Sequence, residues 1–163
     1  MTDQTDDRTI LSRLVGSWRG TLLYRADADG PFEEMIGTSE NRWVLGGRFV
    51  EIALRAGDVW SAIFYIGHER TERRHVLVSL EPGGRRGMPR LGDWLTDGGR
   101  LILTSSQSRV ICDTTNPGLL TLRLAETAAG GHEFVRFEAD YRPVVAIAPK
   151  PAVSRPQRRF VIA

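Results

Sequence analysis

The fold of this chain is decided by the stretch Leu14-Val15-Gly16-Ser17-Trp18-Arg19-Gly20-Thr21-Leu22. Gly16 lets the chain turn tightly out of a short helix, because glycine has no Cβ atom. The indole of Trp18 then supplies a large apolar group at the start of a strand. The stretch therefore predicts a helix, a tight turn and the first strand of a small β-barrel, with Trp18 as a plug for one end.

Length and composition indicate one domain. The chain has 163 residues, and Cys112 is its only cysteine, so an intramolecular disulfide is excluded. No apolar run approaches the roughly 20 residues of a membrane helix. The N-terminus, Met1 to Asp7, is acidic and polar, unlike a secretory signal. We therefore expect a cytoplasmic protein without a membrane partner.

The charge pattern does not indicate a nucleic-acid partner. Lys150 is the only lysine among 22 basic residues, and acidic residues are interspersed with the arginines. A GC-rich coding sequence and selection for anion binding both explain an excess of arginine over lysine.

A short helix is predicted over 6–15. Asp6 or Asp7 is the expected cap. The apolar residues of this segment fall on one side: Ile10, Leu11 and Leu14. Such a helix would close one end of a barrel.

After Trp18 the apolar residues recur with a period of two, which is typical of strands. Gly, Pro, Asn and Asp separate the runs at intervals typical of an antiparallel meander. The sequence therefore predicts an all-β, single antiparallel up-and-down barrel of about ten strands. The strands are expected at 18–26, 34–43, 47–56, 58–67, 73–81, 90–95, 100–106, 108–114, 118–126 and 133–142.

The domain organisation follows from these runs. Residues 1–10 are expected to form a flexible or helical lead, and residues 11–142 the barrel. Residues 143–163 form a Pro-rich C-terminal arm, because proline removes donors from a strand ladder. The arm is either mobile or a docking segment, on the barrel or on a second subunit, so it is the candidate contact for a homodimer.

Three sequence blocks and one residue spacing on the last predicted strand carry a family resemblance. They are Leu14 to Gly20, Gly37-Thr38-Ser39, Arg42 to Glu51, and the spacing of Glu138, Tyr141 and Arg142. In order and spacing they resemble a bacterial lipocalin-like family, domain-of-unknown-function family 1579. The segments at 67–69 and 80–90 depart from that family's pattern.

The resemblance implies a calycin-type barrel with a central cavity and implies no activity. A more distant likeness links the chain to the haem-binding nitrobindin barrels. In those barrels a proximal histidine stands three residues before a tyrosine on the last strand, and Glu138 holds that place here. Because a carboxylate is a poor haem ligand, haem is not expected, and no other cofactor is implied.

Charged residues on the strands are the first candidates for chemistry. Alternation on the last strand puts Val135, Phe137, Ala139 and Tyr141 inside and leaves Glu138 in solvent, whereas the family likeness turns Glu138 inward. An interior ion pair is expected from Arg42 or Arg48 with Glu51 or Glu138. It would orient the polar end of a ligand or tie strands together.

The candidate acids and bases are Glu138, His75, Glu51 and Tyr141. His75 is the only histidine within a predicted strand, and a solvated strand histidine is the alternative interpretation. The three histidines and Cys112 share no metal-ligand spacing, so no metal site is expected.

A second set of residues is expected to contact a ligand, although ordinary core packing accounts for part of it. This set consists of Arg42, Trp43, Arg48, Trp60, Phe64, Tyr65 and Trp94.

The leading functional hypothesis is binding of a small hydrophobic or amphipathic molecule in the barrel, with a small-molecule ligand or substrate as the partner. The alternative is a cofactor-free cyclase or isomerase of a polyketide-like or terpenoid metabolite, which would suit secondary metabolism. A third is a structural protein that engages a partner through residues 143–163. Motifs for phosphoryl transfer, dinucleotide binding and triad hydrolysis are absent from the sequence.

Overall fold

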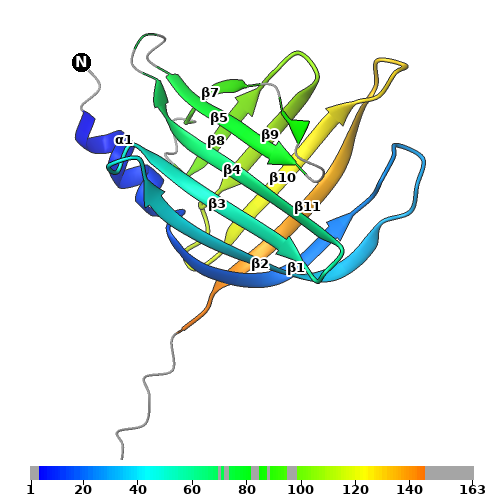
Figure 1. Cartoon of the computed structure of the whole chain (residues 1–163), viewed down its shortest axis with the longest axis horizontal. Coiled ribbons are helices and arrows are strands. Elements are labelled where there is room, and N and C mark those ends of the chain that lie inside the picture. The colour runs from blue at the N-terminus through cyan, green and yellow to red at the C-terminus, as the bar shows by residue number, and fades with distance from the viewer. Residues whose placement is uncertain are drawn as a thin grey trace, which may run out of the picture.

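Ten antiparallel strands close into an up-and-down barrel in the computed structural model of the chain (Figure 1). The structure describes residues 4–69, 71, 74–81, 85–87, 89–94 and 99–145. The elements in chain order are α1 (Gln4–Ser12), β1 (Gly16–Tyr24), β2 (Glu33–Val44), β3 (Phe49–Ala56), β4 (Trp60–Glu69), β5 (Arg74–Glu81), β6 (Arg85–Arg86), β7 (Arg90–Trp94), β8 (Arg100–Thr104), β9 (Ser108–Asp113), β10 (Leu120–Thr127) and β11 (Glu133–Pro143).

Each barrel strand pairs with its neighbours in the order β4-β3-β2-β1-β11-β10-β9-β8-β7-β5, and β4 pairs with β5 to close the ring. The two-residue strand β6 pairs with β5, with Leu80 opposite Arg86. The predicted up-and-down barrel is therefore confirmed. Closure pairs the edge strands, which would otherwise expose their backbone donors and acceptors.

The helix is shorter than predicted and begins earlier. It ends at Ser12, and Asp6 and Asp7 lie within it, so neither is the expected cap. After the helix, backbone hydrogen bonds join residues that are three apart. Leu14 N–H donates to the Leu11 carbonyl, and Val15 N–H donates to the Ser12 carbonyl. Within the described part of the chain, no helix is long and apolar enough to cross a membrane.

Gly16 and Trp18 act as predicted at the start of β1. Gly16 has a φ of 137°, a conformation that residues with a Cβ rarely adopt. Trp18 is buried, and its Nε1 donates to the Leu14 carbonyl at 3.1 Å. Asn41 Nδ2 donates to the same carbonyl at 2.7 Å, and Asn41 Oδ1 accepts from Ser39 Oγ. These bonds fix the turn between α1 and β1 on the barrel.

The middle of the barrel is a packed core. Phe137 on β11 contacts Phe64 and Trp60 on β4, across the interior, at ring separations of 6.2 and 5.5 Å. Side chains from most strands around them leave almost no surface that water reaches, among them Leu22, Ile52, Leu103, Val110 and Leu122. These described side chains therefore pack together in the middle of the barrel.

Gly37 makes room for the buried side chain of Tyr141, and Gly20 allows the backbones of β1 and β11 to approach closely. A Cβ atom at Gly37 would lie 2.8 Å from the Tyr141 hydroxyl oxygen, and one at Gly20 would overlap the Asp140 carbonyl. The Tyr141 side chain thus reaches β2 across β1, where no larger residue is accommodated without a shift.

β11 ends at Pro143, the first residue of the predicted arm. The N–H of Val144 still donates to the Ser17 carbonyl at 2.8 Å. The rest of the arm, from residue 146 on, lies outside the described residues, as do residues 1–3 of the predicted lead.

We expect Gly37→Ala to lower the free energy of unfolding by about 1–3 kcal/mol, because the new methyl group meets the Tyr141 hydroxyl. Tyr141→Phe removes that oxygen and should recover part of the loss in the double variant. Urea unfolding followed by circular dichroism measures both. Strictly additive effects of the two substitutions would contradict the contact.

Candidate binding site at the mouth of the barrel

The two ends of the barrel differ. Leu11 and Leu14 pack into the core at the end covered by α1. The opposite end, here called the mouth, is formed by the connections 25–32, 57–59, 105–107 and 128–132 (Figure 1). Several inward-facing side chains there are only half-buried: Tyr24, Met35, Trp60, Ser108 and Glu126. Among the described residues, the interior wall therefore meets solvent at the mouth.

One side of the mouth is aromatic. Tyr24 on β1 contacts Trp60 on β4 at 6.0 Å between ring centroids, and Trp60 contacts the fully buried Phe137. The rings are tilted by 37° and 58° to one another, so they form a shelf rather than a parallel stack. Such tilted contacts are favourable for aromatic pairs.

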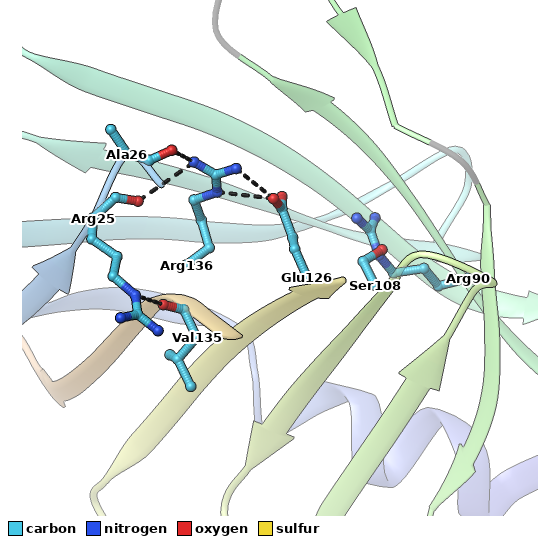
Figure 2. A network of polar contacts seen from close by, with 7 residues as sticks. All are labelled: Arg25, Ala26, Arg90, Ser108, Glu126, Val135 and Arg136. Carbon is cyan, nitrogen blue, oxygen red and sulfur yellow. Dashed lines mark hydrogen bonds and ion pairs between the residues drawn. The ribbon is translucent and has the colours of Figure 1, made fainter. Parts of the chain in front are cut away.

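The other side is polar. Arg136 donates from Nε and Nη2 to Glu126 Oε2, at 2.9 and 2.5 Å. Its Nη1 donates to the carbonyls of Arg25 and Ala26 at the end of β1. Figure 2 shows this pair in one row with Ser108 and Arg90.

Arg90 extends the polar side to β7 and β5. Its Nε donates to Ser108 Oγ at 2.7 Å and its Nη1 to Ser79 Oγ at 3.1 Å. Arg90 is 3% exposed and Ser79 is fully buried, so a guanidinium lies inside the wall of the barrel. Ser105 Oγ lies 3.0 Å from Ser108 Oγ and continues the line of hydroxyls.

The charge on Arg136 is stabilised where it lies. Burial lowers the pKa of Arg136, but hydrogen bonding and attraction to Glu126, with a contribution from Tyr24, outweigh it and raise the pKa above its ordinary value. The side chains of Arg136 and Glu126 are 25% and 24% exposed, so the pair is screened less than one in open solvent.

A β-bulge explains how Arg136 reaches the rim of the mouth. The register between β10 and β11 shifts at Leu124 and Ala125: Leu124 faces Phe137, but Ala125 faces Val135. Arg136 is the extra residue, so its side chain departs from the alternation of the strand. It then lies beside Phe134, with its guanidinium carbon 5.2 Å from that ring.

Five of the sequence-predicted residues face inward. Trp60 lies at the mouth, and Phe64 and Tyr141 lie in the packed core. Trp43 is half-buried near α1, with the Arg8 guanidinium 5.4 Å from its ring. His75 is 3% exposed and lies 5.3 Å from the ring of His68.

Tyr141 is sealed from solvent. Its hydroxyl has no hydrogen-bond partner among the described residues, and burial raises its pKa. It is therefore a neutral phenol at physiological pH. Contact with a substrate would require the core to open.

Arg42, Glu51 and Tyr65 form a cluster on the outer wall. Arg42 Nε lies 2.9 Å from Glu51 Oε1, so one expected pair forms. The expectation that it lies inside is wrong, because Arg42 is 73% exposed on the outward-facing side of β2. A hydrogen bond to Glu51, followed by burial, raises the pKa of Tyr65.

Glu138 also lies on the outer wall. Its carboxylate is 3.4 Å from Arg123 Nε and 45% exposed, so alternation predicted its face correctly and the family likeness did not. Arg48 is exposed in the turn between β2 and β3. Trp94 ends β7, and its side chain lies outside the described set.

The polar residues of the mouth were not predicted. Glu126 continues the inward series Leu120, Leu122, Leu124. This spacing of two could have predicted that Glu126 faces the interior. Arg136 gives no such signal in the sequence, because it stands between Val135 and Phe137, both of which alternation places inside.

Comparison with known proteins identifies no family for the chain. No protein-family model and no curated protein matches it. Among solved structures, it is similar to a protein of unknown function from the DUF3598 family of Nostoc punctiforme, with 16% sequence identity and a TM-score of 0.43. The match covers 80% of this chain and 47% of that one, so the chain spans about half its length. The resemblance to family 1579 stays a prediction.

We expect Glu126→Ala to lower the free energy of unfolding by about 1–3 kcal/mol, because it leaves Arg136 without its carboxylate in a partly buried position. The matched control is Glu138→Ala, which breaks an exposed pair and should cost less than about 0.5 kcal/mol. Chemical denaturation compares the two, and equal losses would contradict the difference in environment.

Proposed function

We propose that the protein binds a small amphipathic molecule at the mouth of the barrel. A barrel fold is compatible with ligand binding. The observation that supports this location is that two kinds of surface adjoin at the mouth. The half-buried rings of Tyr24 and Trp60 form one, and the polar side chains of Ser108, Glu126 and Arg136 form the other, with Tyr24 beside Arg136.

The two surfaces define the ligand's chemistry. Tyr24 and Trp60 present apolar ring faces, which favour an aromatic or otherwise flat apolar body. The polar side carries the partly exposed guanidinium of Arg136, the carboxylate of Glu126 and the hydroxyl of Ser108, which is held by the buried Arg90. The guanidinium and the hydroxyl suit a ligand group that accepts hydrogen bonds. Such a group also keeps the ligand in one orientation.

The packed core favours a ligand site at the mouth over a site deeper in the barrel. A ligand in the middle of the barrel would have to separate Phe137 from Phe64 and Trp60, which contact each other across the interior. Interiors packed in this way lose contact energy when they are opened. At the mouth a ligand replaces water instead.

We do not propose the cyclase or isomerase function. Glu51 and Glu138 lie on the outer wall, and the Tyr141 hydroxyl is enclosed in the core. His75 is the one remaining acid or base of the predicted set, and it is also buried. No feature of the described residues brings these groups together at a place open to substrate.

Binding is tested with three ring-matched probes: naphthalene-2-carboxylate, 2-naphthalenemethanol and 2-naphthalenemethylamine. Isothermal titration calorimetry is expected to show saturable binding of at least one probe. Trp60→Leu should weaken it by about tenfold, because the ring contact is lost. Trp43→Leu, at the end near α1, is the control and should leave the affinity unchanged.

No binding of any probe to the folded wild-type protein would contradict a site for compact aromatic ligands. Equal weakening by Trp43→Leu and Trp60→Leu would contradict its position at the mouth.

A further inference from the structure

The outer surface of β5 inverts the pattern expected of a barrel strand. After the exposed Arg74, its outward residues are Val76, Val78 and Leu80, whereas the inward set includes His75 and Ser79. A strand with one solvated face ordinarily keeps its polar residues outside. The apolar outer face of β5 therefore needs a physical explanation.

Neighbouring strands extend this apolar surface. In register, Ile63 lies opposite Leu80, Tyr65 opposite Val78, and Leu91 opposite Val76. Gly67 faces Val76, and a Cβ there would lie 2.5 Å from the ring of Phe49, which covers it. We call this surface the β4–β5 face. It consists of Phe49, Ile63, Tyr65, Val76, Val78, Leu80 and Leu91.

The β4–β5 face differs from the opposite outer wall. Its seven residues carry no charge, all but Leu80 are half-buried, and Leu80 is 41% exposed. On β1 and β11 the outward positions include Arg19, Glu138, Asp140 and Arg142. Solvent contact alone accounts for that charged wall and does not account for the apolar one.

We propose that the β4–β5 face pairs with the same face of a second copy of this chain. Two copies related by a two-fold axis present identical patches to each other, so an uncharged apolar patch is complementary to itself. This surface is distinct from the mouth, and the inference does not depend on the proposed function.

The size of the face fits the centre of a dimer interface. The seven residues, at roughly 4.8 Å between strands and roughly 6.8 Å between successive outward residues, cover about 230 Å². A standard interface buries about 800 Å² on each partner, with an apolar centre and a polar rim. The β4–β5 face therefore supplies the centre, and the residues around it supply the rim.

The charges at the border are compatible with self-association. Arg42 and Glu51 form an ion pair on the side of β3, and Arg74 and Asp93 form another between β5 and β7, at 3.3 Å. Each pair contains both signs, so two copies can meet without placing like charges together. A border of one sign would repel its copy instead.

The test is the mass of the full-length protein in solution. Sedimentation velocity over a concentration series is expected to show a dimer for the wild type. Val78→Lys and Tyr65→Lys should each shift it to monomer, because they place a charge at the centre of the contact. Leu23→Lys, on the outer wall of β1, is the matched control and should leave the dimer intact. Circular dichroism confirms that each variant is folded.

Cross-linking adds a direct readout. Cys112 is buried, and burial raises the pKa of its thiol to about 12, so an introduced surface cysteine is the reactive one. A short bismaleimide should cross-link Val78→Cys to a covalent dimer and leave Leu23→Cys monomeric. A wild-type monomer at every concentration would overturn the proposal. So would a dimer that survives both lysine variants, which would point to another surface, such as the C-terminal arm.

Discussion

The contact of Phe137 with Trp60 and Phe64 is the constraint on which the interior of this barrel depends. These residues lie on β11 and β4, strands that are far apart around the ring, and their rings meet across it. The two walls therefore touch in the middle of the barrel. Inward-facing groups that are open to solvent are then found at the mouth, where Tyr24 and Trp60 are half-buried.

A single extra residue arranges the polar half of that mouth. The bulge in β11 turns Arg136 toward Glu126, and the same guanidinium holds the carbonyls of Arg25 and Ala26. Arg25 in turn donates to the Val135 carbonyl at 2.7 Å. The ion pair therefore ties the start of the connection between β1 and β2 to the strands that carry the polar wall, and it serves both structure and the proposed site.

How far the sequence predicts this structure depends on the kind of feature. Period-two alternation, with glycine at the turns, was sufficient for the strand order, and Gly16 and Trp18 marked the first strand correctly. Alternation also placed Glu138 on the correct face. The residues of the site were harder to predict than the strands, because Arg136 departs from alternation at the bulge. Arg42 and Glu51 do pair as expected, yet they lie outside, since charge matching does not reveal which face of a strand is inward.

The central claim is that the mouth, and not the middle or the α1 end, receives the ligand. The most direct measurement is a heteronuclear NMR titration with naphthalene-2-carboxylate that follows backbone amides and the indole N–H of each tryptophan. The account predicts the largest shift changes at Tyr24, Trp60, Ser108 and Glu126, with Trp18 and Trp43 unchanged. Changes centred on Trp18, Trp43 and α1 would contradict it.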